Sequence, residues 1–137
     1  AYPGKLKGIL QLLEKLQAEG NIDGYGFQMH HRVLEPGMSM LRNAVKAVAA
    51  TGLKLRVSEL DVGIKKNTEE QFKKQAKKYA DVMNLMLEYA DQTEAVQVWG
   101  LTDGMSYRKY EYPLLFDASC NPKPAFWAVA DPSQAFE

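Results

Sequence analysis

The stretch that most constrains the fold runs from Leu53 to Val62, where aliphatic residues are interleaved with polar ones that include two carboxylates. Helical periodicity precedes it at 39–51, where Ser39 is a suitable N-cap, and follows it from a capping box at Thr68 to Ala90. A buried strand between two amphipathic helices implies parallel strands joined by right-handed crossovers. The chain is therefore predicted to adopt an α/β fold.

The alternation of helices and strands continues in both directions. We predict further helices at 5–18 and from Pro124 onward, and further strands at 22–30 and 95–102. Such a chain builds either an open doubly wound sheet or part of a (β/α) barrel. No G-x-G-x-x-G or other glycine-rich phosphate loop joins a strand to a helix, which weakens the nucleotide-binding alternative.

Polar or aromatic side chains lie at the carboxyl end of every predicted strand. These are Gln28 and His30, then Glu59 and Asp61, then Trp99 and Asp103. Barrel enzymes build their sites at the carboxyl ends of their strands. The distribution therefore favours a barrel over an open sheet.

Length and charge narrow the class of partner. The 137 residues suffice for one domain, and 17 basic residues balance 17 acidic ones. No net field favours nucleic acid or a membrane, so a neutral substrate or a protein partner fits better. The single cysteine, Cys120, leaves the redox compartment undecided, and neither a membrane span nor a signal-peptide pattern is present, which predicts a soluble chain.

Glu59 is the leading candidate for chemistry. Simple alternation places one set of side chains on the same face of the strand: Leu53, Leu55, Val57, Glu59 and Asp61. Glu59 could act as nucleophile, general acid or base, or metal ligand, and a carboxylate nucleophile suits an acetal substrate. The alternatives are a buried salt bridge to Arg56 or Arg108 for Glu59, and a strand-terminal cap for Asp61.

His30 is expected to support Glu59. An imidazole can serve two partners at once, so His30 could orient Glu59 and keep it ionised, while His31 is interpreted as structural. The spacing of His30, Glu59 and Asp61 matches no familiar zinc pattern, so no metal is expected.

Aromatic residues cluster around the last strand and the loop after it: Trp99, Tyr107, Tyr110 and Tyr112. Such rings either stack on neutral sugars or belong to the core. Phe126 and Trp127, on the closing helix, are assigned to the core. Serine or cysteine nucleophiles are not supported, because no Gly-x-Ser-x-Gly elbow occurs and no histidine lies near Cys120 in the sequence.

Taken together, five motifs resemble glycoside hydrolase family 10, the endo-1,4-β-xylanases. In order they are the segments 22–30 (IDGYGFQMH), 57–62 (VSELDV), 98–103 (VWGLTD), 113–117 (PLLFD) and 122–125 (PKPA). The resemblance spans essentially the whole chain. It implies a (β/α)8 TIM barrel that hydrolyses β-1,4-xylan with retention through a covalent glycosyl-enzyme, without a cofactor.

The resemblance also implies roles for individual residues. Glu59 corresponds to the nucleophile, and His30 and Asp61 correspond to its hydrogen-bonded supports. Gln28 and Trp99 correspond to walls of the sugar subsite beside the scissile bond. Tyr107 stands where the family usually has tryptophan, and it would cover the sugar with a smaller face that carries a hydroxyl.

One family motif is absent from the 137 residues. The general acid/base of the family lies in a Trp-x-x-x-Asn-Glu segment, which does not occur here. The resemblance therefore implies that residues 1–137 are the C-terminal part of the catalytic barrel, with strands six to eight and flanking helices, and that they are inactive alone. Asp61 cannot replace the acid, because both carboxylates would approach the sugar from one side.

Two other functions stay open at this stage. The chain could be a non-catalytic carbohydrate-binding or assembly module, or a related glycosidase acting on another β-linked polymer. Cut from a closed barrel, three strands would expose open edges, which predicts pairing with the N-terminal part of the barrel or self-association. By resemblance, the protein is expected to be secreted.

Overall fold

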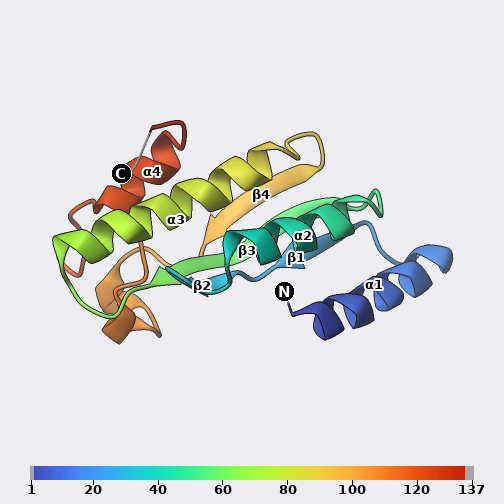
Figure 1. Cartoon of the computed structure of the whole chain (residues 1–137), viewed down its shortest axis with the longest axis horizontal. Helices are drawn as coiled ribbons and strands as arrows, with labels where there is room; N and C mark the ends of the chain where they lie inside the picture. The colour runs from blue at the N-terminus through green and yellow to red at the C-terminus, as the bar shows by residue number, and fades with distance from the viewer. Residues whose placement is uncertain (1, 135–137) are drawn as a thin grey trace.

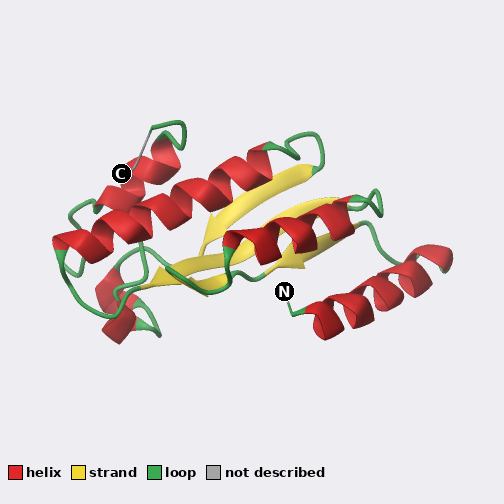
Figure 2. Cartoon of the chain, viewed as in Figure 1, coloured by secondary structure: helices red, strands yellow, loops and turns green. Residues whose placement is uncertain are grey.

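The computed structural model describes residues 2–134, which form one parallel sheet with helices against one of its faces (Figure 1). The helices are α1 (Pro3–Ala18), α2 (Met38–Ala49), α3 (Glu69–Leu87) and α4 (Pro124–Ala130), with short 3-10 turns at Asp103–Met105 and Lys109–Glu111. The strands are β1 (Gly24–Phe27), β2 (His30–Arg32), β3 (Lys54–Gly63) and β4 (Thr93–Val98). The predicted alternation of helices and strands is confirmed, and Figure 2 shows it along residues 2–134.

β3 is the centre of the sheet. It pairs in parallel with β1 and β2 on one side and with β4 on the other. Among the described strands, β1 and β4 are each paired on one side only. The sheet is therefore open, as expected for part of a barrel and not for a complete one.

The single strand predicted at 22–30 is divided into two. Met29 has a φ of 63°, in the left-handed region, and it separates β1 from β2. Met29 nevertheless packs into the core, so the interruption places Gln28 and His30 at the end of the sheet without opening the core. The strand predicted at 95–102 is also displaced and shorter, because it ends at Val98 before Gly100, whose φ is 136°.

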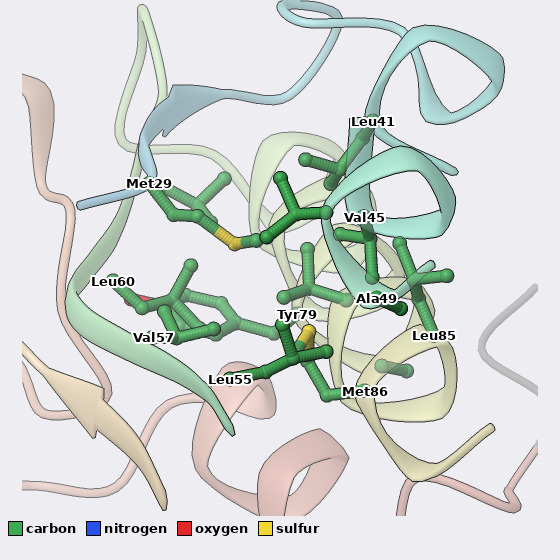
Figure 3. Packing of buried hydrophobic residues seen from close by; sticks show 14 of the residues in the cluster. Met29, Leu41, Val45, Ala49, Leu55, Val57, Leu60, Tyr79, Leu85 and Met86 are labelled. Carbon is green, nitrogen blue, oxygen red and sulfur yellow. The ribbon is translucent and has the colours of Figure 1, made fainter. Parts of the chain in front are cut away.

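The core lies between β3 and the two helices α2 and α3. Figure 3 shows Leu55, Val57 and Leu60 projecting from β3 toward these helices, where they meet side chains such as Val45 and Tyr79. All five are fully buried. Burial of each such side chain stabilises the fold by about 1.5–3 kcal/mol, so this layer fixes the position of β3.

Two helix predictions need correction. α2 begins after Gly37, without a side-chain cap from Ser39. Trp127 is 55% exposed and does not belong to the core, because α4 buries Ala125 and Ala128 and directs Trp127 away from them. The cap at Thr68 is confirmed, since its hydroxyl accepts a hydrogen bond from the Gln71 amide at 3.4 Å.

No helix among residues 2–134 is long and apolar enough to span a membrane.

Candidate active site

An irregularity in β3 decides which side chains reach the open face of the sheet. Val57 pairs with Val96 and Leu60 pairs with Val98, so β3 advances three residues while β4 advances two. The extra residue is a β-bulge, which reverses the alternation of side chains along the strand. Before the bulge, odd-numbered residues are buried against the helices, and after it Leu60 and Val62 take that place.

The predicted face of Glu59 and Asp61 is therefore wrong. Simple alternation put them on the same face as Leu55 and Val57, but the bulge turns them to the opposite face of the sheet. Arg56 lies on that open face and is exposed, where it donates a hydrogen bond to Gln97 at 3.1 Å. The two carboxylates remain on one side of the strand, as predicted, but not on the side that carries the core.

His30 joins the two carboxylates. Its Nε2 lies 2.8 Å from Oε2 of Glu59, and its Nδ1 lies 2.9 Å from Oδ2 of Asp61. The pairing of β2 with β3 places His30 directly beside Asp61. The structure thus brings together all three residues that the sequence nominated as nucleophile and supports.

The two contacts of His30 restrict which atoms can carry the protons of these hydrogen bonds. A neutral imidazole has one N–H, and an ionised carboxylate only accepts hydrogen bonds. Both ring nitrogens donate only when the ring is an imidazolium, and otherwise one of the carboxyl groups must hold the proton. The two contacts together therefore need two protons, one more than a neutral imidazole supplies.

Asp61 is the buried anchor of this cluster. Its side chain has no exposed surface, and its second oxygen, Oδ1, accepts from the guanidinium of Arg108. Arg108 also donates to the carbonyl of His31 at 3.1 Å. The salt-bridge alternative for Glu59 is not found, because Arg108 pairs with Asp61 and with Glu111, and Arg56 pairs with Gln97.

The residues predicted to bind substrate lie around the same strand ends. Gln28 is exposed, and its carbonyl accepts from the amide of Glu59 at 3.1 Å. Trp99 is 47% exposed, and its amide donates to the carbonyl of Leu60 at 2.9 Å. Both side chains are thus exposed, and their backbones are hydrogen-bonded to Glu59 and to its neighbour Leu60.

Tyr107 covers the imidazole of His30 from the loop after β4. The two ring centroids are 5.6 Å apart at an interplanar angle of 80°, an edge-to-face contact. Burial, followed by the negative charge of Asp61, raises the pKa of the Tyr107 phenol. The hydroxyl is therefore a neutral hydrogen-bond donor near pH 7.

A buried ion pair fixes the loop that carries Tyr107 and Arg108. Lys123 Nζ donates to Oδ2 of Asp103 at 2.9 Å and to the carbonyls of Tyr112 and Leu114, both at 2.8 Å. Burial lowers the pKa of Lys123, and the contact with Asp103 opposes that shift. Sequence reasoning placed Asp103 among the strand-end polar residues but assigned no role to Lys123, which lies twenty residues further on.

Among residues 2–134, no group of three or more histidine, cysteine, aspartate or glutamate side chains is arranged to hold a metal ion. His30 directs its two nitrogens at different carboxylates, so the cluster is a hydrogen-bonded one.

Comparison with known proteins identifies the family. The model of Glycosyl hydrolase family 10 matches residues 2–132. The chain belongs to glycosyl hydrolase family 10. The family match and the open parallel sheet agree with the predicted α/β fold, part of a TIM barrel.

Relatives from three bacteria cover nearly the whole chain. Endo-1,4-beta-xylanase C of Paenibacillus barcinonensis is 35% identical over 94% of this chain and 14% of its own length. Exoglucanase XynX of Acetivibrio thermocellus is 34% identical over 96% of this chain and 12% of its own. A solved variant of xylanase 10C from Cellvibrio japonicus, in complex with xylopentaose, is 30% identical with a TM-score of 0.86, covering 93% of this chain and 31% of that one. The family 10 chain thus spans about a third or less of each of these three proteins.

Proposed function

We propose that this chain is the C-terminal part of a retaining endo-1,4-β-xylanase and that Glu59 is its nucleophile. The observation that carries the proposal is the cluster in which His30 bridges Glu59 and Asp61 at hydrogen-bond distance on the open face of the sheet. Membership of family 10 and the xylanase names of relatives support the choice of xylan as substrate.

In the proposed reaction, an ionised Oε of Glu59 attacks the anomeric carbon of a xylosyl unit. A carbon–oxygen ester bond forms as the glycosidic carbon–oxygen bond breaks, and water later hydrolyses the ester. His30 holds Glu59 in place, and Asp61 holds His30. Gln28, Trp99 and Tyr107 form the wall of the sugar subsite beside the scissile bond.

The leaving oxygen needs a proton that this cluster is poorly placed to give. Asp61 is fully buried and uses both oxygens, one with His30 and one with Arg108. A retaining glycosidase also needs its two carboxyl groups about 5–5.5 Å apart on opposite sides of the bond. We therefore propose that the general acid/base comes from another part of the barrel, outside these 137 residues, and that this chain alone is inactive on xylan.

The open sheet suggests how the barrel is completed. β1 and β4 each have an unpaired edge among the described strands, and such edges recruit further strands. We propose that the N-terminal part of the barrel pairs there, and that self-association takes its place when that part is missing. A secreted location would follow from a xylan substrate, because that polymer is extracellular.

Covalent trapping tests the nucleophile separately from the acid. A 2,4-dinitrophenyl 2-deoxy-2-fluoro-xylobioside carries a leaving group that departs without protonation, so Glu59 should displace it even without an acid. Intact-mass measurement should then show one added fluoro-xylobiosyl group, absent from Glu59→Gln. Labelling of Glu59→Gln, or its absence from the native chain even when mixed with an N-terminal barrel part, would refute the assignment.

Xylan hydrolysis tests whether the chain alone is an incomplete enzyme. The chain alone should release no reducing sugar, and addition of the N-terminal part of a family 10 barrel should restore release. Robust turnover by the isolated chain would overturn the proposed division of roles. Turnover of another β-linked polymer in preference to xylan by the completed barrel would instead identify a related glycosidase.

A carbohydrate-binding role is the second candidate, favoured by exposed aromatic rings at the end of β4 and in the loop after it. Trp99 is 47% exposed, Tyr107 is 66% exposed and Tyr110 is 82% exposed. Calorimetric titration with xylo-oligosaccharides distinguishes the two functions. Tight binding that survives Glu59→Ala but not Trp99→Ala, together with no covalent labelling, would favour the binding module.

A further inference from the structure

The cluster around Glu59 continues to the protein surface through Arg108. Arg108 pairs with Asp61 through Nη1, and its Nη2 donates to Oε2 of Glu111 at 2.5 Å. Glu111 in turn accepts from Nε of Arg32 at 3.1 Å and from Nη2 of Arg32 at 2.9 Å. These contacts form one unbroken series of hydrogen-bonded partners, which we call the relay: Arg32, Glu111, Arg108, Asp61, His30 and Glu59.

Burial increases along the relay from Arg32 to Asp61, which an isolated surface ion pair would not show. The Arg32 side chain is 55% exposed, that of Glu111 is 31% exposed and that of Arg108 is 11% exposed, until Asp61 is fully buried. Arg108 thus carries interactions between a solvent-facing pair and the buried anchor of the site. Each Arg–carboxylate contact also fixes direction, because the guanidinium donors form a rigid planar fork.

Backbone pairing holds both ends of the arrangement in register. Arg32 and His30 are two residues apart on β2, and they pair with Gly63 and Asp61 on β3. Glu111 is tied to the same strand end, because its carbonyl accepts from the amide of Ile64 at 2.7 Å. The loop after β4 therefore delivers Arg108 and Glu111 to a fixed place beside β2 and β3.

Gly63 leaves open the space that the side chains of Arg108 and Glu111 occupy. A side chain at Gly63 would place its Cβ 2.7 Å from Nη2 of Arg108 and closer still to Oε2 of Glu111. Only glycine leaves room for the pair at this position. The contact with Arg32, followed by that with Arg108, also keeps the pKa of Glu111 below its usual range, so Glu111 is ionised near pH 7.

We propose that Arg32 and Glu111 are positioning residues for the nucleophile, acting through Arg108, Asp61 and His30 on the orientation of Glu59. Arg108 fixes the Asp61 carboxylate, Asp61 fixes the tilt of the imidazole, and the imidazole fixes the attacking oxygen. Neither Arg32 nor Glu111 contacts the reacting atoms. The inference rests on the proposed role of Glu59 as nucleophile and assigns that site a further outer layer.

The test uses Glu111→Gln, which keeps the shape of the side chain and removes its charge. The matched control is Glu88→Gln, because Glu88 pairs with Arg42 on the surface of the same chain, remote from Glu59 in the contacts described. Arg32→Gln and Arg42→Gln form a second matched pair. Arg32 and Arg42 are similarly exposed, so neither change threatens folding.

Two measurements report on different parts of the relay, the His30 ring and the attack by Glu59. The ¹⁵N signals of the His30 imidazole, assigned by their loss in His30→Gln, report ring orientation and hydrogen bonding in the full chain. The first-order rate constant for labelling of Glu59 by the dinitrophenyl fluoro-xylobioside reports attack. We expect Glu111→Gln to move the His30 signals and slow labelling about tenfold at unchanged inhibitor affinity, whereas Glu88→Gln should change neither.

Unmoved His30 signals in both Glu111→Gln and Arg32→Gln would overturn the relay, whatever happens to the labelling rate. Moved signals with native labelling rates would also overturn it, because the ring would then shift without consequence for Glu59. If no variant is labelled and the native chain is not labelled either, the proposed nucleophile fails. The His30 spectra would still decide whether the surface pair controls the imidazole.

Discussion

Val57 and Leu60 are both fully buried against the helices, although they lie three residues apart on one strand. In a regular strand, residues three apart face opposite sides. The bulge between them, visible in the pairing with β4, turns Leu60 back to the core and directs Glu59 and Asp61 to the open face.

The bulge predicts how sensitive the chain is to substitution at Leu60. Leu60→Ala should lower the free energy of unfolding by about 2–5 kcal/mol, since it leaves a cavity in a close-packed layer. Arg56→Ala, on the open face, should change it by about 0.5 kcal/mol or less. Urea denaturation of both variants measures the difference, and equal effects would contradict the reversed alternation.

How far the sequence predicts the fold is clear from β3. Its length, its central place between two helices and its parallel pairing follow from periodicity, because burial on the helix-facing side requires apolar residues. The face of Glu59 was missed although the sequence carries a sign of the bulge. Aliphatic residues stand at 53, 55 and 57 and then at 60 and 62, so the alternation shifts by one residue between Val57 and Leu60. The split of the first strand at Met29 was missed because a left-handed backbone at a non-glycine residue is not signalled by residue type.

The candidate site was predictable in part. Glu59, Asp61 and His30 were nominated from strand ends and family motifs, and the structure brings them together. The sequence suggests Arg108 only as a partner of Glu59, and it gives no signal for Glu111 or Arg32. Their contacts join a loop to two strands across 47 to 79 residues of sequence, and no local pattern encodes such a meeting.

The buried pair of Lys123 and Asp103 should be a strong determinant of stability. Lys123→Met would leave the Asp103 carboxylate buried with no cation beside it, at a cost of about 3–5 kcal/mol. Thermal unfolding should show a large loss for this variant. Lys77→Met breaks the exposed pair with Asp81 and serves as control, with an expected cost of about 1 kcal/mol or less.

A second change separates charge from packing at this pair. Adding Asp103→Asn to Lys123→Met removes the unpaired charge, so part of the lost stability should return. If the double variant is no more stable than Lys123→Met, the effect belongs to lost packing and not to the buried carboxylate.

His31 should make stability depend on pH. Burial lowers the pKa of His31 to about 3, and among the described residues its Nδ1 has no hydrogen-bond partner. An unfolded histidine titrates near pH 6.5, so below that pH the unfolded state binds one proton more than the folded state. Stability is therefore complete above about pH 6.5 and falls by about 1.4 kcal/mol per pH unit below it.

Comparison with a non-titrating variant isolates this contribution. Between pH 7 and pH 5, the native chain should lose about 2 kcal/mol more of its unfolding free energy than His31→Gln does. Chemical denaturation at a series of pH values measures both slopes. Glu111 and other carboxyls with lowered pKa change the free energy of unfolding only below about pH 4.5. The range from pH 5 to 6.5 therefore reports on His31. Parallel slopes there would mean that His31 is accessible to protons in the folded state.

Gly63 should be energetically coupled to Glu111. A methyl group at Gly63 would displace the carboxylate of Glu111 and the end of Arg108, and overpacking of this kind costs about 1–3 kcal/mol. Gly26→Ala is the matched control in a neighbouring strand, because the nearest atom to its added Cβ is Ser58 Oγ at 3.9 Å. Gly26→Ala should therefore cost less than Gly63→Ala.

A double-mutant cycle then assigns the cause. Glu111→Ala removes the carboxylate that the new methyl group would strike, so the cost of Gly63→Ala should shrink by about 1 kcal/mol or more in that background. The displaced Arg108 should also report directly, through a shifted side-chain Nε–H signal in Gly63→Ala and an unshifted one in Gly26→Ala. Strict additivity with an unshifted Arg108 signal would show that Gly63 is required for its backbone alone, because the glycine would then make no room for the ion pair above it.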